Sequence, residues 1–232
     1  MRAKIFADGA DLKEMIELNE NPIVSGFTTN PSILAKAGIT DYKQFAQSAL
    51  RHIVKKSISF EVFSDNLDEM EEQAKEIASW GKNVYVKIPI TNTRGEFTVG
   101  KINHLCLQKI KVNVTAVFTT PQAKDAMLAI GENKGIVSVF AGRIADAGVA
   151  PFPIMADMAA WMRSKYENQQ LLWASPRQVY DVVLADKSNC HIITMPKSLI
   201  DKIPLLGKNL NDFSLETVKM FYDAAQKSGY TI

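Results

Sequence analysis

Short apolar runs alternate with longer amphipathic segments along the whole chain, and this alternation constrains the fold more than any other feature. The runs are apolar at nearly every position, which is typical of strands that are buried on both faces. Strands are predicted at residues 3–8, 24–28, 58–62, 84–90, 112–117, 136–140, 171–174 and 191–194. Helices are predicted at residues 12–18, 41–55, 67–80, 98–108, 121–130 (capped by Thr120), 154–167, 176–185, 198–202 and 214–227.

Helices between successive strands favour parallel pairing. Eight strand–helix units close into a barrel, whereas five or six would form an open sheet. The length of 232 residues is normal for one such barrel, and no Gly/Ser-rich or Pro-rich linker divides the chain. We therefore expect an α/β fold, a single (β/α)8 TIM barrel over residues 1–232 with an additional C-terminal helix.

Composition excludes several classes of function. The net charge of +2 is too small to indicate a nucleic-acid or membrane-surface partner. Cys106 and Cys190 lie far apart without a CxxC motif, and the three histidines are scattered, so no metal site is expected. Residues 1–15 contain no apolar signal region, and no run is long enough for a membrane helix. We expect a cytoplasmic protein.

Polar side chains occur at the ends of the predicted strands. In a barrel of this kind the active site lies at the C-terminal ends of the strands. Asp8 ends the first strand, and Glu61 and Lys87 lie within the third and fourth. The other polar residues near strand ends are Thr28, Thr29, Asn30, Asn113, Thr115, Ser138, Arg143, Ser175, Arg177 and Thr194. Together these residues predict a polar site at one end of the barrel.

Lys87 lies inside the apolar run VYVKIPI, between Val86 and Ile88. Its ammonium group loses water there, which is costly unless the group is paired or neutral. Burial favours the neutral form of a lysine, and a neutral amine is the form that attacks a carbonyl carbon. Two compatible interpretations follow: a structural lysine paired with Glu61 or Asp8, and a nucleophile that forms a Schiff base.

Asp8 and Glu61 are candidate proton carriers. Schiff-base chemistry needs one acid/base to dehydrate the carbinolamine and another to take a hydroxyl proton while a C–C bond breaks. Asp8 has a second interpretation, as the N-cap of the helix that follows Gly9. Glu61 has no such alternative, because an inward carboxylate in an apolar strand needs a polar partner.

Arg143, Ser175 and Arg177 predict an anion site. Arginine offers planar, bidentate donors that suit phosphate. Residues 175–177 fall where a helix is predicted to begin, and free N–H groups at a helix start attract anions. Phosphate sites in these barrels commonly lie after the seventh and eighth strands. The alternative is a surface arginine beside a serine N-cap.

Five segments of this sequence resemble the transaldolase family. They are GFTTNPSIL at 26–34, VYVKIPIT at 84–91, NVT at 113–115, FAGR at 140–143 and ASPR at 174–177. The resemblance covers nearly the whole chain in matching order, and it is greatest to the short, single-barrel branch that includes fructose-6-phosphate aldolase. It implies an enzyme of carbohydrate metabolism and the pentose phosphate pathway that acts on sugar phosphates without a metal or an organic cofactor.

The resemblance also implies a role for each matched residue. Lys87 matches the Schiff-base lysine, and Asp8 matches the aspartate that handles protons during C–C cleavage. Glu61 and Thr115 match the pair that holds and activates a water. The residues that match the substrate-binding set are Thr29, Asn30, Asn113, Ser138 and Phe140, with Arg143, Ser175 and Arg177 as the phosphate clamp.

Two positions distinguish transfer from release of the three-carbon unit. Aldolase-type members tend to carry Gln where Glu61 stands and Tyr where Phe140 stands. A tyrosine hydroxyl helps water or a proton reach the carbanionic intermediate, and Phe140 has none. The expected reaction is therefore transfer of dihydroxyacetone from fructose 6-phosphate or sedoheptulose 7-phosphate to an aldose phosphate. The alternatives are an aldolase that releases free dihydroxyacetone and a catalytically silent sugar-phosphate-binding barrel.

The resemblance further implies a homo-oligomer. Many members of the short branch form pentamers or decamers in which the C-terminal helix reaches a neighbour, so residues 214–228 are expected to serve oligomerisation. Two departures border the predicted phosphate site. The stretch that follows FAGR is rich in Pro and Met, with Asp146 at the position of a family aspartate, and Pro176 replaces the usual Phe.

Overall fold

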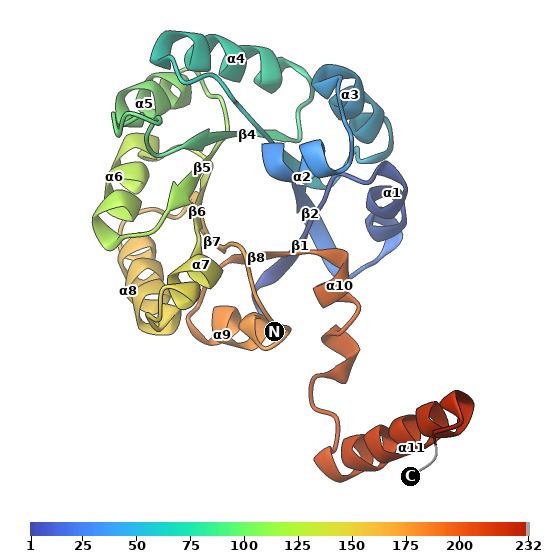
Figure 1. Cartoon of the computed structure of the whole chain (residues 1–232). Coiled ribbons are helices and arrows are strands. Elements are labelled where there is room, and N and C mark those ends of the chain that lie inside the picture. The colour runs from blue at the N-terminus through green and yellow to red at the C-terminus, as the bar shows by residue number, and fades with distance from the viewer. Residues whose placement is uncertain (231–232) are drawn as a thin grey trace.

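The computed structural model describes residues 1–230, and within them eight parallel strands close into a barrel in the order of the sequence (Figure 1). Helices surround the barrel, and a separate helix follows at the C-terminal end of the chain. The predicted TIM barrel with an additional C-terminal helix is thus confirmed.

The strands follow the predicted apolar runs closely. They are β1 Lys4–Asp8, β2 Val24–Thr28, β3 Ser57–Glu61, β4 Val84–Pro89, β5 Val112–Val117, β6 Gly135–Val139, β7 Gln169–Trp173 and β8 Ile192–Met195. Each strand is only four to six residues long and is buried along most of its length. Because successive side chains alternate between the two faces of a strand, each strand contributes to both the barrel interior and the layer under the helices.

The helices depart from the prediction in more places. They are α1 Leu12–Glu20, α2 Pro31–Lys36, α3 Tyr42–His52, α4 Leu67–Ser79, α5 Val99–Leu107, α6 Thr120–Ile130, α7 Ala141–Asp146, α8 Pro151–Arg163, α9 Asp181–Lys187, α10 Lys197–Ile200 and α11 Leu210–Ser228, with a 3₁₀ turn, η1, at Ile203–Leu205. The short helices α2 and α7 were not predicted, because six residues form fewer than two turns and show no clear periodicity.

Several helix starts differ from the prediction; α11, for example, begins at Leu210 after the cap residue Asn209 rather than at residue 214. Three other starts differ for local reasons. Thr119, not Thr120, caps α6: its side chain accepts from Gln122 N at 3.3 Å, and the Gln122 side chain accepts from Thr119 N at 3.1 Å. Helix α8 begins three residues earlier than expected, at Pro151, because proline suits the first helical position. Helix α9 begins at Asp181 rather than at residue 176, so residues 175–180 form a loop.

A cluster of apolar side chains fills the barrel below its C-terminal mouth. Phe6, Ile136, Leu172 and Ile192 belong to this cluster and are each at most 3% exposed. The Phe6 ring lies against Gly26, where an added Cβ atom would be only 2.6 Å from the nearest ring carbon. The interior is therefore packed rather than open, and only its C-terminal end is free for a site.

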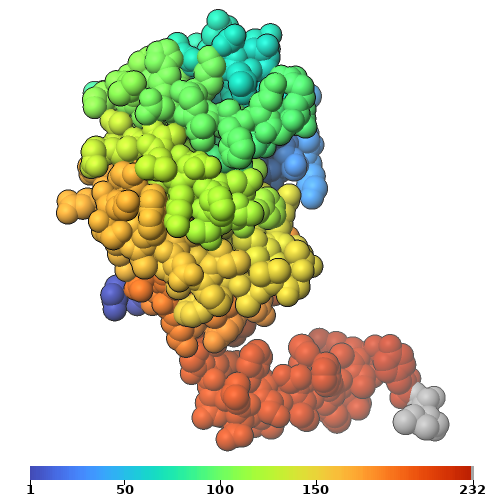
Figure 2. Space-filling view, turned by 90° about the vertical axis from the view of Figure 1, so that its left-hand side faces the viewer, coloured from blue at the N-terminus to red at the C-terminus, as the bar shows by residue number. Residues whose placement is uncertain are grey.

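Helix α11 extends away from the barrel as an arm (Figures 1 and 2). Several of its large apolar side chains are exposed in this single chain, among them Leu210 at 79%, Phe221 at 63% and Tyr222 at 63%. Residues 1–230 include no helix that is both long and apolar enough to cross a membrane.

Candidate active site

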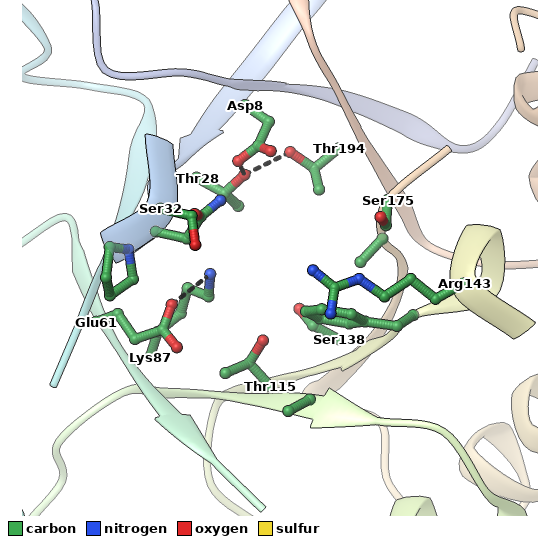
Figure 3. Close-up of a pocket in the computed structure, with 15 residues that line it drawn as sticks. Asp8, Thr28, Ser32, Glu61, Lys87, Thr115, Ser138, Arg143, Ser175 and Thr194 are labelled. Carbon is green, nitrogen blue, oxygen red and sulfur yellow. Dashed lines mark hydrogen bonds and ion pairs between the residues drawn. The ribbon is translucent and has the colours of Figure 1, made fainter. Parts of the chain in front are cut away.

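A cavity of about 330 Å³ opens at the C-terminal ends of the strands (Figure 3). Its size lies at the lower end of the range for small-ligand sites. The lining residues are Asp8, Thr28, Asn30, Pro31, Ser32, Glu61, Lys87, Thr115, Ala116, Ser138, Phe140, Arg143, Ala174, Ser175 and Thr194. The structure thus brings most of the predicted site residues into one cavity.

Lys87 projects from β4 into this cavity, and only 8% of its side chain is exposed. Its Nζ lies 2.9 Å from Glu61 Oε2 and donates to the backbone oxygen of Thr29 at 2.8 Å. Glu61 and Lys87 are register partners on β3 and β4, which places the two side chains next to each other. The expected ion pair is present, and the same amine faces the cavity (Figure 3).

Asp8 lies across the cavity from Lys87 (Figure 3). Its Oδ1 accepts a hydrogen bond from Thr28 Oγ1 at 2.7 Å. Asp8 keeps some surface open to the cavity but is otherwise packed among protein atoms. This burial raises the pKa of Asp8 above its ordinary value, and the charge of Lys87 and the bond from Thr28 offset only part of the rise. Asp8 is not a helix cap, because Asp11 caps α1.

Glu61 is fixed by a residue that the sequence did not point to. The Tyr42 hydroxyl, at the first turn of α3, donates to Glu61 O at 3.0 Å and accepts from Glu61 N at 2.7 Å. Burial raises the pKa of Tyr42 above its ordinary value. Because Tyr42 contacts only the backbone of Glu61, it anchors the end of β3 and leaves the carboxylate facing Lys87. A tyrosine at a helix start gives no signal of this role in the sequence.

Thr115 faces the cavity from β5 because it lies two positions after the inward-facing Asn113, and the strand is irregular near this point. The register between β5 and β6 shifts between Val114 and Val117, and Ala116 has a φ of 56°. Thr115 Oγ1 is buried and has no hydrogen-bond partner within residues 1–230. Since a buried hydroxyl without a partner costs about 1–3 kcal/mol, this oxygen suits a bound water or a substrate hydroxyl.

Two other predicted residues lie behind the cavity wall rather than on it. Asn113 is fully buried; its Oδ1 accepts from Ser138 Oγ at 2.6 Å, and its Nδ2 donates to Ser59 Oγ at 3.1 Å. Thr29 is fully buried as well, and its hydroxyl donates to the Ser59 backbone oxygen at 2.9 Å. Asn113 therefore orients Ser138, which does line the cavity, while Thr29 offers Lys87 a backbone oxygen.

Arg143 and Ser175 form the side of the cavity opposite Lys87 (Figure 3), and Phe140 also lines the cavity. The Arg143 guanidinium lies 5.0 Å from the centre of the Phe140 ring, which holds it in place by a cation–π contact. Ser175 has a φ of 61°, an uncommon conformation for a residue with a side chain. The backbone of Gly142 in α7 packs directly on the Ser175 carbonyl, which brings the two loops together.

Arg177 does not line the cavity. Its Nε donates to both carboxylate oxygens of Asp146, at 3.0 and 2.9 Å, and its Nη1 donates to Ser175 Oγ at 3.0 Å. Arg177 N donates to Asp181 Oδ2 at 2.6 Å and so is not a free helix N–H. The predicted helix start at this loop is therefore wrong. Of the three residues predicted to bind an anion, Arg143 and Ser175 line the cavity and Arg177 lies behind them.

Six lining residues were given no site role by the sequence, although two of them, Thr28 and Thr194, were noted as polar residues near strand ends. The six are Thr28, Pro31, Ser32, Ala116, Ala174 and Thr194. Thr28 and Ser32 lie beside Asn30, which caps α2 by accepting from Ile33 N at 3.0 Å. The TTNPS motif could have indicated both, because it runs from a strand end into this helix. The described residues contain no group of three His, Cys, Asp or Glu side chains that could hold a metal ion.

Replacing Asp8 with Asn is expected to raise thermal stability at pH 7 while lowering activity. A raised pKa means that the folded state binds the Asp8 proton more tightly than the unfolded state does. The folded protein is therefore most stable below the unfolded pKa near 3.8, and it loses stability as pH rises through the folded pKa. The neutral Asn keeps the shape and removes one of two carboxylates that face one lysine. We expect the free energy of unfolding of the variant to be about 1 kcal/mol higher at pH 7, the usual size when a destabilising group is removed from a functional site.

Thermal melts of the Asp8→Asn variant and the parent protein at pH 7 and at pH 3.5 measure this effect. The difference should shrink at the lower pH, where the parent carboxyl is also protonated. A variant that melts below the parent protein at pH 7 would contradict a destabilising charge at Asp8.

Sequence comparison relates the chain to one family over nearly its whole length. The profile described as transaldolase/fructose-6-phosphate aldolase matches residues 5–231. A probable transaldolase from Streptococcus agalactiae serotype V (strain ATCC BAA-611 / 2603 V/R) is 34% identical over 224 residues, which cover 97% of this chain and 99% of that protein. A probable transaldolase from Shouchella clausii (strain KSM-K16) is 35% identical over 213 residues, 90% of this chain and 94% of that protein.

Solved structures with low sequence identity share the fold. Type I 3-dehydroquinate dehydratase from Clostridium difficile, crystallised with covalently modified comenic acid, aligns with a TM-score of 0.58 at 12% identity over 88% of this chain and 92% of that chain. KGPDC from Streptococcus mutans aligns with a TM-score of 0.56 at 11% identity over 85% of this chain and 89% of that chain. At these identities the likeness concerns the barrel alone.

Proposed function

This chain belongs to the transaldolase/fructose-6-phosphate aldolase family, and from that membership and the cavity we propose that it is a transaldolase. The reaction moves a dihydroxyacetone unit from a ketose phosphate, such as fructose 6-phosphate or sedoheptulose 7-phosphate, to an aldose phosphate. One observation supports this proposal above the others: Lys87 is buried, paired with Glu61 and open to a cavity that also contains Asp8 and Arg143.

In the first half of the reaction, the Lys87 amine attacks C2 of the ketose. The resulting carbinolamine loses its oxygen as water and becomes an iminium ion. Glu61 lies 2.9 Å from Lys87 Nζ, a distance at which it accepts the amine proton and returns it to the departing oxygen. The unpartnered Thr115 hydroxyl supports the proposal that a water is held between this pair and the substrate.

In the second half, Asp8 takes the proton of the C4 hydroxyl as the C3–C4 bond breaks. The electron pair of that bond enters the enamine on Lys87, and the aldose phosphate leaves. The enamine carbon then attacks the aldehyde carbon of the acceptor, and Asp8 returns its proton to the new hydroxyl. One water hydrolyses the iminium ion that this forms, which frees the new ketose phosphate and the Lys87 amine. A carboxyl with a raised pKa suits this proton transfer, because it is a stronger base than an ordinary carboxylate and can return the proton it takes.

The phosphate of the donor is proposed to bind at the far side of the cavity from Lys87. Arg143 provides the cation there, and Ser175 provides a hydroxyl. Arg177 already holds Asp146 and Ser175, so we propose that it orients Ser175 and contacts the phosphate only if it leaves Asp146.

Phe140 is proposed to favour transfer over release. Its ring lines the cavity without a hydroxyl that would bring water or a proton to the enamine. A Phe140→Tyr variant should release free dihydroxyacetone from fructose 6-phosphate, without an acceptor, at least about tenfold faster than the parent protein, as expected for an added proton donor. Phe118→Tyr is the matched control, because its ring lies 5.5 Å from that of Phe140 but outside the cavity lining.

A coupled assay with and without an acceptor distinguishes transfer from release. With erythrose 4-phosphate present, glyceraldehyde 3-phosphate should form steadily from fructose 6-phosphate. Without an acceptor, at most one equivalent should form per active site. Steady release of dihydroxyacetone without an acceptor would identify the protein as an aldolase instead.

We also propose that the protein works as a homo-oligomer of five or ten copies in which α11 packs on a neighbouring copy. The exposed apolar side chains of α11, with Val218 and Met220 next to Phe221 and Tyr222, support this. Light scattering with size-exclusion chromatography should give a multiple of 25.8 kDa, and Phe221→Asp should reduce it. A parent protein that elutes as a monomer would exclude the assembly.

A cytoplasmic location is proposed as well. Cys106 and Cys190 are both buried as free thiols. Burial raises the pKa of Cys106 to about 11 and that of Cys190 to about 12, which keeps both unreactive. Free thiols are usual in a reducing compartment.

A further inference from the structure

Two threonine hydroxyls form a chain that ends on Asp8 (Figure 3). Thr28 Oγ1 lies 2.7 Å from Asp8 Oδ1 and 2.6 Å from Thr194 Oγ1. The two threonines come from β2 and β8, the strands that flank β1 on either side. Both are buried, at 3% and 5% exposure, and both line the cavity.

The direction of these hydrogen bonds follows from how many protons the two hydroxyls and the carboxyl carry. A hydroxyl carries one proton and accepts through two lone pairs, and an ionised carboxylate only accepts. Thr28 must therefore give its proton to the Asp8 carboxylate, so Thr194 must give its own proton to Thr28. When Asp8 is protonated, the chain can reverse, with Asp8 donating to Thr28 and Thr28 donating to Thr194.

We propose that Thr194 is a positioning residue for Asp8 that acts through Thr28. The proposal rests on the proposed function, in which Asp8 takes and returns a substrate proton. The two threonines can hydrogen-bond to Asp8 whether it is ionised or protonated, so they hold one of its oxygens in place in both forms. The other oxygen is left for the substrate hydroxyl. Chained hydrogen bonds also polarise one another, so the Thr194 proton strengthens the bond from Thr28 to the carboxylate.

The ionisable groups whose charges act on Asp8 are Lys87 and Glu61. Within residues 1–230, Thr28 is the hydrogen-bond partner of the Thr194 hydroxyl, and neither Lys87 nor Glu61 bonds to it. Without the Thr194 hydroxyl, the bond from Thr28 would stabilise the Asp8 carboxylate less. The acid limb of the pH–rate profile should then move to higher pH.

Thr194→Val removes the hydroxyl and keeps the shape. We expect kcat to fall up to about tenfold, the upper end of the effect of one hydrogen bond between neutral groups, with KM changed by less than about twofold. The acid limb of kcat against pH should move upward, and Thr194→Ser should restore both values. Thr98→Val is the control, because Thr98 is equally buried and its hydroxyl bonds only the backbone oxygen of Pro89, outside the cavity lining.

A double-mutant cycle tests the route through Thr28. The double variant Thr28→Val/Thr194→Val should be no slower than Thr28→Val alone, because the chain is already broken at Thr28. Additive losses would overturn the proposal. A rise in KM at unchanged kcat would overturn it as well, since Thr194 would then contact the substrate directly.

A measurement that does not depend on catalysis tests this proposal separately from the proposed function. The titration of the Asp8 carboxyl can be followed by ¹³C NMR of aspartate-labelled protein, with the Asp8→Asn variant assigning the signal. An upward shift in Thr194→Val supports the positioning role even if the parent protein transfers no dihydroxyacetone. An unchanged titration overturns it even if the parent protein is an active transaldolase.

Discussion

Replacing Lys87 with Met is expected to lower kcat by at least about 10⁴-fold, the scale on which enzymes lose rate when a covalent nucleophile is removed. Methionine keeps the length of the apolar stem in β4 and removes only the amine. No other lysine lines the cavity formed by the described residues, so none can replace Lys87. Steady-state transfer from fructose 6-phosphate to erythrose 4-phosphate measures the loss.

The fold should tolerate Lys87→Met once Glu61 is replaced by a neutral residue. Glu61 loses its cation in Lys87→Met, and removing one partner of a buried ion pair costs about 3–5 kcal/mol. The double variant Lys87→Met/Glu61→Gln should recover most of that stability and stay inactive. A folded, inactive double variant separates chemistry from folding, whereas measurable turnover in it would rule out Lys87 as the nucleophile.

Replacing Gly142 with Ala is expected to have the largest effect on stability. An added Cβ atom would lie 1.6 Å from the backbone oxygen of Ser175, a distance that no side-chain movement can relieve. Helix α7 and the loop after β7 must then separate, which should cost more than about 3 kcal/mol. Arg143 and Ser175 would move apart with them, so affinity for the phosphate group should fall with stability.

Urea unfolding and the ratio of kcat/KM for fructose 6-phosphate over unphosphorylated fructose measure the two effects. Gly100→Ala is the matched control, because Gly100 lies in α5 with nothing within 4 Å of an added Cβ. Alanine should stabilise that helix by about 0.5–1 kcal/mol. A Gly142→Ala variant as stable as the parent protein would show that the contact between α7 and Ser175 is not required.

The alternation of apolar runs predicted the barrel because strands and helices each leave a pattern in the local sequence. Strands buried on both faces need continuous apolar residues, and the helices between them need an apolar stripe. The short helices α2 and α7 escaped prediction because six residues show no clear periodicity, although Asn30 and Pro31 mark the start of α2. The start of α9 was misplaced for a different reason: Ser175 adopts a left-handed conformation that depends on its contact with Gly142.

The site was predictable where a polar residue interrupts an apolar strand, as Lys87 and Glu61 do. It was less predictable where the role depends on a partner far away in the sequence. Tyr42 acts on Glu61 across 19 positions, and Thr194 meets Thr28 across 166. The orientation of Arg177 depends on Asp146, 31 positions away. No local pattern encodes these contacts.

Reductive trapping tests the proposed Schiff base most directly. The parent protein is incubated with fructose 6-phosphate and sodium borohydride, digested, and sequenced by mass spectrometry. The account predicts one three-carbon adduct per chain, on the peptide that contains Lys87, and none in Lys87→Met. An unmodified Lys87 in protein that still consumes fructose 6-phosphate, or an adduct on another lysine, would contradict it.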